Sequence, residues 1–455
     1  MTEIYEAINE IKEPTCEEVR GILDKAGKFK GLTIEEALKL LLIKDDESLS
    51  LLFHSAREIK KSVFGRRIVL FAPLYLSNYC INNCLYCGFR KDNSEAERRR
   101  LTLEEVLSEV KYLEEKGLKR VLLVLGEDYS RFSLKDLIKV VDSIYKETGM
   151  RIVHVNAPPM DVEPLRCLKE AGVGVFQAFQ ETYHKPTYEE MHPSGRKRDF
   201  NYRFEVMDRA FKAGFEDVGI GTLLGLFDYK FDVLATISHS YALMERFGSH
   251  AHTISLPRLR PASGVPLKRE PYTVSDDQLK KIVAVYRLSV PSAGIVVTTR
   301  EREALRRELI HLGASQLSAG STTEPGGYTV ANVEGSEGHA GEQFPINDHR
   351  SIEVVIASIV EDGLLPSLCT SCYRVGRTGP VFTHKSLTGE MEPLCHSNAI
   401  LTLQEYLLDH ATNCLKEIYR EVIEGAVLEI KDRGMKEGVK KRLRDLEAGK
   451  RDIFF

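Results

Sequence analysis

The chain has 455 residues, of which 43% are hydrophobic and 29% are charged, and its formal net charge is −4. This length exceeds what one hydrophobic core usually serves, so we expect a large domain with additions. The slight acidic excess argues against nucleic-acid binding, which needs a basic surface. The absence of a long apolar run argues against a membrane protein, and the acidic N-terminus has no apolar signal core. These features predict a cytoplasmic protein, where clustered cysteines more often bind metal than form disulfides.

Residues 3–63 predict short amphipathic helices, because apolar residues recur at helical spacing in stretches such as LTIEEALKLLLIK. Eight short apolar runs then alternate with helical patterns, and glycine ends several of these patterns as a helix stop should. The predicted strands lie at residues 67–76, 120–127, 151–158, 173–181, 218–226, 252–260, 294–299 and 315–321. Eight strands separated by helices favour a (β/α)8 barrel of the TIM type over an open doubly wound sheet.

From about residue 323 this alternation stops. The stretch TEPGGYTVANVEGSEGHAGEQFPIND predicts a long loop, and helical patterns resume at 351–363 and fill 398–446. The expected organisation is a helical N-terminal extension, the barrel and a helical C-terminal domain, at residues 1–64, 65–325 and 326–455. The basic segment 440–451 is interpreted as a solvated helix face rather than a nucleic-acid site.

Three of the nine cysteines, Cys80, Cys84 and Cys87, fall within eight residues directly after the first predicted strand. Catalytic groups of a (β/α)8 barrel come from such strand ends. Three thiolates at this spacing can hold three irons of a cubane iron–sulfur cluster and leave the fourth iron open for a small molecule. A four-thiolate zinc site is a weaker alternative, because no fourth cysteine lies nearby.

The stretch CINNCLYC resembles the CxxxCxxC signature of radical S-adenosylmethionine (SAM) enzymes, including the aromatic Tyr86 before the last cysteine. The resemblance implies a [4Fe–4S] cluster whose open iron is chelated by the methionine amino and carboxylate groups of SAM. It further implies that one electron from the reduced cluster splits SAM and releases a 5′-deoxyadenosyl radical. It also implies that Gly126 and Glu127, at the end of the second predicted strand, receive the methionine amino group of SAM. An ordinary acidic strand end is the alternative for Glu127.

Two further candidates for SAM binding follow the fourth predicted strand. Glu181 emerges from an apolar run, and Arg203 opens the next predicted helix. An arginine there can pair with the methionine carboxylate as a bidentate fork, although an arginine on a helix surface is nearly as good a reading. His184 and His192, in the loop between them, receive no role.

A second group, Cys369, Cys372 and Cys395, forms a CxxC motif followed by 22 residues and a third cysteine. Three thiolates again predict an iron–sulfur cluster with one uncommitted iron. The alternative is a Cys3His zinc site completed by His396, which is strained because Cys395 and His396 are consecutive. The remaining cysteines sit in helical patterns and are predicted to be buried apolar residues: Cys16, Cys167 and Cys414.

The whole chain resembles the HydG family, the tyrosine lyase maturases of iron–iron hydrogenases, in stretches such as FQETYHKPTY, HTISLPRLRPASG and CTSCYRVGRTG. The resemblance implies that the radical abstracts hydrogen from L-tyrosine, whose Cα–Cβ bond breaks to give p-cresol and dehydroglycine. Dehydroglycine then yields carbon monoxide and cyanide, which an extra iron on the auxiliary cluster captures to build a hydrogenase cofactor precursor. The implied partners are a reductant protein and other hydrogenase maturation proteins.

Three lesser candidates follow from position in the predicted barrel. His252 opens the sixth strand and is a candidate ligand to the extra iron, since neutral imidazole suits iron. An ordinary core histidine is the alternative. Arg300 and Ser318, near the ends of the seventh and eighth strands, are candidates to hold the carboxylate and amine of tyrosine.

Two other functions compete with this reading. The barrel alone also resembles 2-iminoacetate synthase of thiamine biosynthesis, which cleaves tyrosine similarly but lacks the second cysteine motif. The other alternative is a non-enzymatic zinc or iron–sulfur scaffold that delivers metal to a partner. The iron content of the protein distinguishes the scaffold from the two-cluster enzyme, because two clusters need about eight irons whereas a zinc site holds one metal.

Overall fold

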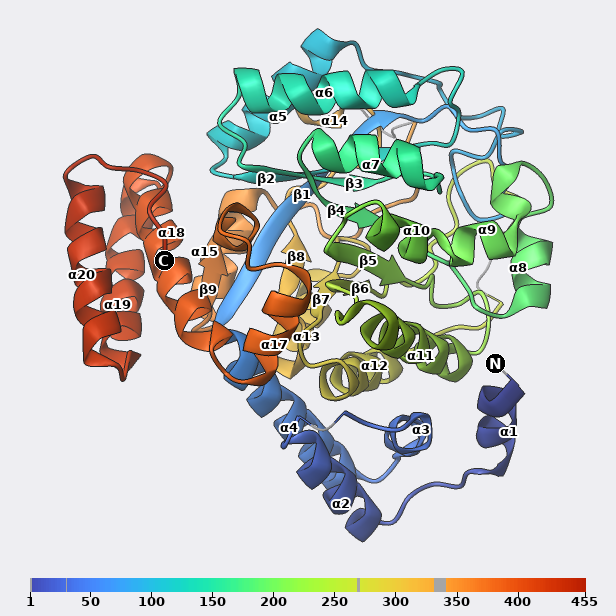
Figure 1. Ribbon diagram of the computed structural model, residues 1–455, viewed down its shortest axis with the longest axis horizontal. Coiled ribbons are helices and arrows are strands. Elements are labelled where there is room, and N and C mark those ends of the chain that lie inside the picture. The colour runs from blue at the N-terminus through green and yellow to red at the C-terminus, as the bar shows by residue number, and fades with distance from the viewer. Residues whose placement is uncertain (1, 30, 268–270, 331–340) are drawn as a thin grey trace.

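The protein is described here by a computed structural model, which covers residues 2–29, 31–267, 271–330 and 341–455. Eight parallel strands form a closed barrel, in which β1 pairs with both β8 and β2 (Figure 1). The barrel strands are β1 (Arg67–Ser77), β2 (Arg120–Leu125), β3 (Ile152–Asn156), β4 (Val173–Gln177), β5 (Asp217–Gly221), β6 (Thr253–Ser255), β7 (Gly294–Val297) and β8 (Gln316–Ser318). Each strand overlaps its predicted apolar run, so the predicted (β/α)8 fold is confirmed.

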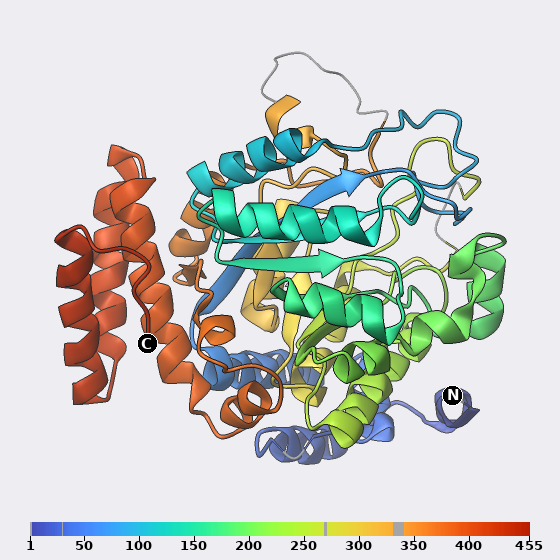
Figure 2. The same ribbon diagram turned by 45° about the horizontal axis from the view of Figure 1, so that its top comes forward.

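Helices connect the strands and cover the outside of the barrel (Figures 1 and 2). Local sequence explains where several begin: at the start of α5, Thr102 accepts the backbone N–H of Glu105, whose side chain accepts the N–H of Thr102. These helices are α5 (Leu103–Glu115), α6 (Leu134–Glu147), α7 (Val162–Glu170), α8 (Lys185–Met191), α9 (Phe200–Phe204), α10 (Val206–Lys212), α11 (Tyr229–Phe247), α12 (Asp276–Ser289) and α13 (Glu303–Leu312). Because every strand points the same way, all strand ends that carry candidate residues meet at one mouth of the barrel.

The N-terminal helices pack against the barrel helices rather than standing apart. They are α1 (Thr2–Glu10), α2 (Cys16–Ala26), α3 (Ile34–Leu42) and α4 (Asp46–Phe64). The hydroxyl of Tyr241 on α11 donates to the carbonyl of Leu32 at 2.9 Å, and Lys281 on α12 donates to the carbonyl of Ile43 at 2.9 Å. The helical pattern predicted for this part of the chain is confirmed.

The C-terminal part is mainly helical, and α18, α19 and α20 stand together at one side of the molecule (Figures 1 and 2). Its elements are α14 (Gly327–Val330), α15 (Ile352–Glu361), β9 (Leu365–Ser367), α16 (Ser371–Arg374), α17 (Gly379–Leu387), α18 (Met391–Asp409), α19 (Asn413–Glu429) and α20 (Arg433–Glu447). Part of the predicted long loop, residues 331–340, lies outside the described residues. Among the described helices, none has the length and apolarity that crossing a membrane requires.

A ninth strand, β9, was not predicted. It pairs in parallel with the first residues of β1, Arg67–Val69, before β2 takes over beside β1 from Ala72. The long β1 therefore extends below the barrel, and β9 covers the edge that this extension exposes. Cys369 lies two residues after β9, so this pairing holds the second cysteine group at the N-terminal end of the barrel.

Candidate active site

The C-terminal ends of the strands surround a cavity of about 200 Å³, and Cys80, Cys84 and Cys87 all line it from the loop after β1. Burial, and then the neighbouring Cys80, raise the pKa of the Cys87 thiol to about 11. A thiol must lose its proton to bind iron, so loading a cluster here releases protons. In the described part of the chain, no three His, Cys, Asp or Glu side chains are placed to hold one metal ion. A cubane cluster makes a different demand, because each thiolate binds a different iron, and three converging thiols fit it.

The end of β2 brings a carboxylate next to this loop. Glu127 is 7% exposed, and its Oε2 accepts a hydrogen bond from Asn82 Nδ2 at 2.5 Å. The preceding Gly126 lies so close to the loop that a Cβ there would stand 2.3 Å from the carbonyl oxygen of Tyr79. Glycine is therefore needed at position 126, because any side chain would push the cysteine loop away from β2.

A largely buried ionic group lies on another wall of the cavity. Lys197 Nζ lies 2.5 Å from Glu181 Oε1, and Arg203 Nη2 lies 3.8 Å from the same atom. Burial raises the pKa of Glu181, but Lys197 and Arg203 lower it by more, so the carboxyl has a pKa below its ordinary value. Glu181 also adopts a left-handed backbone conformation, with φ of 70°. Such strain in a non-glycine residue is typical of functional sites.

Arg203, predicted as a partner of the methionine carboxylate, is buried and lines this cavity. Its Nε donates to the carbonyl oxygen of Phe179 at 2.6 Å, which leaves the terminal nitrogens to face the cavity. Lys197 was missed by sequence reasoning, because it sits in the charged loop segment GRKRD and no pattern separates it from Arg196 and Arg198. Its pKa is lowered by burial and by Arg203, yet Glu181 and Cys84 raise it above the ordinary value.

Tyr86 is anchored by a histidine to which the sequence gave no role. The hydroxyl of Tyr86 lies 2.8 Å from His192 Nε2, while His192 Nδ1 faces the carbonyl oxygen of Tyr188 at 2.7 Å. A carbonyl can only accept, so Nδ1 carries the proton and Nε2 accepts the tyrosine hydroxyl. Burial lowers the pKa of His192 well below its ordinary value, which keeps the ring neutral. His184 instead stacks on Phe227, with ring centroids 3.7 Å apart.

Arg300 and Ser318 line the same cavity from the ends of β7 and β8. The Arg300 guanidinium lies over the Phe344 ring, 3.3 Å from its centroid. The Ser318 hydroxyl accepts the backbone N–H of Thr299 at 3.1 Å, so its own hydrogen remains available to a partner. Gln343, from the segment after the undescribed residues, accepts the hydroxyl of Tyr75 at 2.9 Å and completes this wall.

A second cavity lies at the opposite, N-terminal end of the barrel. Cys369, Cys372, Cys395 and His252 all line it. Burial, followed by the neighbouring Cys395 and Cys369, raises the pKa of the Cys372 thiol to about 12. Arg67 from β1 also faces the three thiols and lowers the pKa of Cys395, against the larger effect of burial. The chemistry of this donor set fits a cluster in the same way as the first set does.

The two cavities share a wall made of Arg120, Gln316 and Tyr373, which line both of them. His252 lies beside this wall: its Nε2 is 3.0 Å from the Tyr373 hydroxyl, and its Nδ1 is 3.2 Å from Asp217 Oδ1. The Asp217 carboxylate lies beside Nδ1 without forming a hydrogen bond to it, and a carboxylate near that nitrogen is usual for histidines that bind metals.

His396 does not join the second cysteine group. Its Nε2 lies 3.0 Å from the carbonyl oxygen of Ala426, on the far side of α18. The prediction that the isolated cysteines are buried was wrong for two of them. Cys16, in the first turn of α2, is partly exposed with its thiol 3.5 Å from Glu47 Oε1, and Cys167 is exposed on α7. The side chain of Cys414 lies outside the described residues.

Comparison with known proteins agrees with this geometry. Residues 74–238 match the radical SAM superfamily model, and residues 255–365 match the biotin and thiamin synthesis associated domain. The 2-iminoacetate synthase of Escherichia coli is 31% identical over 346 residues, which cover 76% of this chain and 89% of that protein. The chain is therefore a radical SAM enzyme with a (β/α)8 barrel.

Two solved structures narrow the family. One, titled as the crystal structure of HydG, a maturase of the [FeFe]-hydrogenase, shares 43% sequence identity and a TM-score of 0.95, covering 100% of this chain and 99% of that one. The HydG maturase from Carboxydothermus hydrogenoformans shares 36% identity and a TM-score of 0.85, with 97% of each chain covered. The chain belongs to the HydG family, and the family resemblance seen in the sequence is confirmed.

Proposed function

We propose that the protein cleaves the Cα–Cβ bond of L-tyrosine to give p-cresol and dehydroglycine, and then converts dehydroglycine into carbon monoxide and cyanide. One observation carries this proposal: two cavities, each lined by three cysteines, share a wall inside one barrel. A lyase that stopped at dehydroglycine would need only the first cavity. The second cavity gives the product a place to react without leaving the protein.

In the first cavity, a cluster held by Cys80, Cys84 and Cys87 would supply, with SAM, a 5′-deoxyadenosyl radical. Glu127 is proposed to accept the methionine amino group of SAM, since it is a buried carboxylate beside the cysteine loop. Arg203 is proposed to pair with the methionine carboxylate. Gly126 lets β2 approach the loop, and Tyr86 and Glu181 line the same cavity.

Tyrosine is proposed to bind beside SAM, with its carboxylate on Arg300 and its amine near Ser318. The Arg300 guanidinium is held by the Phe344 ring and is half-buried in the cavity wall, so a carboxylate meets it with less competing water than at the surface. The Ser318 oxygen already accepts one hydrogen bond and has a second lone pair for an ammonium hydrogen. Lys197, which no pattern in the sequence distinguished, supplies a further positive charge on this side.

In the second cavity, no outside reagent is needed to balance the reaction, because the dehydroglycine anion contains the atoms of one cyanide ion, one carbon monoxide and one water. Cys369, Cys372 and Cys395 are proposed to hold the auxiliary cluster. His252 is proposed to bind an extra iron, which is cargo destined for the hydrogenase cofactor precursor. Its Nε2 would exchange the Tyr373 hydroxyl for this iron, with the Asp217 carboxylate lying beside Nδ1.

A direct test is anaerobic incubation of the reconstituted protein with tyrosine, SAM and a chemical reductant, assaying p-cresol and carbon monoxide in the same samples. We expect both products. Formation of p-cresol without carbon monoxide would favour the alternative, a 2-iminoacetate synthase for thiamine biosynthesis, to which the 31% identity gives some weight. Formation of neither product would favour a metal-delivery scaffold. In the cell, a reductant protein and other hydrogenase maturation proteins are the proposed partners.

Replacing Glu127 with alanine should weaken SAM binding by about tenfold to about a hundredfold, because a hydrogen bond to a charged group contributes about 1.5–3 kcal/mol. The iron content should stay at the parental level, since Glu127 is not a proposed iron ligand. Binding can be followed by equilibrium dialysis of labelled SAM, with Glu190→Ala, an exposed carboxylate on α8, as the control. Unchanged binding in Glu127→Ala would show that Glu127 is only an acidic strand end.

Replacing His252 with alanine should lower the occupancy of the extra iron by at least about tenfold, because its only proposed protein ligand is removed. The cluster on the three cysteines should remain. Iron analysis together with electron paramagnetic resonance separates the two species. His396→Gln is the matched control, because that side chain faces Ala426 and should not matter. If instead His396→Gln loses metal and His252→Ala does not, the site is the Cys3His alternative.

A further inference from the structure

A buried serine lies between the first two cysteines of the second cavity. Ser371 begins α16 and is 1% exposed. Its backbone N–H donates to Cys369 Sγ at 3.4 Å, and its hydroxyl oxygen lies 3.2 Å from the same sulfur. Distance alone does not show which of these two side chains donates. A hydroxyl has one hydrogen and two lone pairs, so its other partners decide the direction.

The other two partners of the Ser371 hydroxyl are both donors. Asn398 Nδ2 lies 3.1 Å from the hydroxyl oxygen, and Arg377 Nη2 lies 3.0 Å from it. A guanidinium and an amide nitrogen carry hydrogens and accept none. Both lone pairs of the oxygen are therefore in use. The hydroxyl hydrogen is left for Cys369 Sγ.

The orientation of Asn398 is itself fixed by the end of the described chain. Asn398 Oδ1 accepts the backbone N–H of Phe455 at 2.9 Å. A backbone N–H can only donate, so the amide oxygen must face Phe455 and the amide nitrogen must face Ser371. Arg377 Nη2 also donates to the main-chain oxygen of Phe455. The same residue thus holds both groups that direct the serine hydroxyl.

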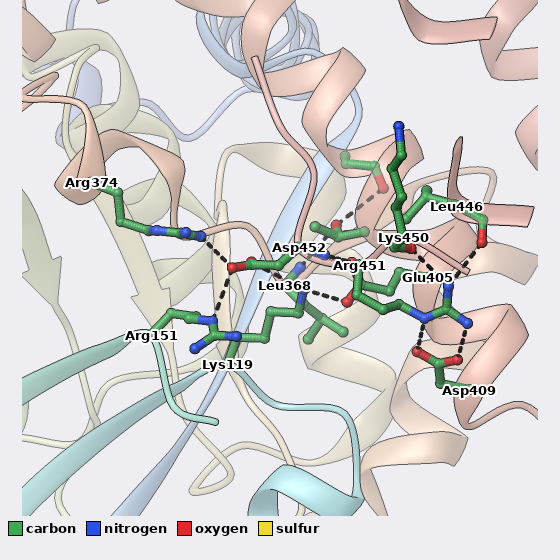
Figure 3. Close-up of polar contacts among 12 residues, drawn as sticks. Lys119, Arg151, Leu368, Arg374, Glu405, Asp409, Leu446, Lys450, Arg451 and Asp452 are labelled. Carbon is green, nitrogen blue, oxygen red and sulfur yellow. Dashed lines mark hydrogen bonds and ion pairs between the residues drawn. The ribbon is translucent and has the colours of Figure 1, made fainter. Parts of the chain in front are cut away.

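Ion pairs keep this terminal segment in place, as Figure 3 shows. Asp452 pairs with Arg151 at 2.9 Å, with Arg374 at 2.7 Å and with Lys119 at 3.4 Å. Arg451 pairs with Asp409 of α18 at 2.6 Å. Lys119 and Arg151 immediately precede β2 and β3, so the segment is tied to the barrel end that carries the second cavity.

We infer that Ser371 is a positioning residue whose hydroxyl donates a hydrogen bond to the Cys369 thiolate and raises the reduction potential of the second cluster. Asn398, Arg377 and the backbone of Phe455 set the direction of that bond. This inference rests on the proposed second cluster. Hydrogen bonds to cluster sulfurs raise the potential, because the reduced cluster carries more negative charge and gains more from each donor.

The test is a redox titration of the second cluster by electron paramagnetic resonance, in full-length protein in which Cys84→Ala removes the first cluster. Ser371→Ala should lower the ratio of reduced to oxidised cluster at a fixed potential by about tenfold, which corresponds to about 59 mV for one electron. Ser371→Thr keeps the hydroxyl and should restore the parental ratio. Ser397→Ala, a buried serine on α18 whose hydroxyl has no partner among the described residues, should change nothing.

A second measurement covers the case in which Ser371→Ala fails to take up a cluster. Electron–nuclear double resonance of the parent in heavy water should show the exchangeable hydroxyl proton of Ser371 coupled to the second cluster, in addition to the proton of its backbone N–H, and Ser371→Thr should retain both. Absence of the hydroxyl proton, or an equal potential in Ser371→Ala and Ser397→Ala, overturns the inference while leaving the second cluster intact. If the Cys84→Ala protein shows no cluster signal at all, the proposed function fails together with the inference.

Discussion

Replacing Cys84 with alanine should reduce the formation of 5′-deoxyadenosine to the level of a protein-free control. The loop after β1 provides three thiols to the cavity, and a cubane held by three thiolates has no spare protein ligand to replace a lost one. Cys84 is only 5% exposed, so an incoming water or buffer ligand has poor access. The measurement is the yield of 5′-deoxyadenosine from SAM and reductant under anaerobic conditions.

The same loss is expected for Cys80→Ala and Cys87→Ala, because each thiolate holds a different iron. Cys16→Ala is the matched control. That thiol is partly exposed, contacts Glu47 and lines neither cavity. It should give the parental yield. Near-parental formation of 5′-deoxyadenosine by Cys84→Ala would refute the assignment of the first cluster.

Replacing both Cys369 and Cys372 with serine should spare much of the p-cresol but suppress carbon monoxide. In the proposed reaction, tyrosine cleavage would require only the first cavity, its cluster and the radical. The conversion of dehydroglycine would require the second cavity, on the other side of the wall that contains Tyr373. Cyanide is expected to fall less than carbon monoxide. The p-cresol and carbon monoxide should be measured in the same reaction, so that their ratio is independent of cluster loading at the first site.

Cys167→Ser is the control for this double variant, since Cys167 is exposed on α7 and lines neither cavity. It should leave both products unchanged. If the double variant releases carbon monoxide at the parental rate, the second cysteine group is structural. The thiamine-type lyase would then be the better reading of the barrel.

The barrel could be predicted because its signals are local. Each strand is a short apolar run bounded by a helical pattern, and the spacing of the apolar residues changes within a few residues at each boundary. The strand β9 could not be predicted in this way. It has three residues, one of them Pro366, and exists only because β1 extends past the barrel and offers an unpaired edge. Such pairing depends on the assembled fold rather than on the segment itself.

In the candidate site, too, features that depend on local sequence could be predicted, and features that depend on the assembled fold could not. The first cysteine group is visible because its thiols are close in the chain, and the second because Cys369 and Cys372 form a CxxC motif. His252 could be proposed from its place at the start of β6. Lys197 and His192 were missed, since their partners Glu181 and Tyr86 come from other loops and only folding brings them together. Cys16 and Cys167 were predicted to be buried because they sit in helical patterns, but the buried faces of α2 and α7 are formed by other residues, such as Ile22 and Leu165.

The measurement that tests the central claim most directly is a reaction of the intact, reconstituted protein with L-tyrosine labelled at its carboxyl carbon. Cyanide must keep the bond between Cα and nitrogen, so carbon monoxide must come from the carboxyl carbon. We expect labelled carbon monoxide and unlabelled cyanide, in company with p-cresol. Release of p-cresol with the label remaining in a two-carbon product, and no labelled carbon monoxide, would contradict the claim that the second cavity completes the reaction.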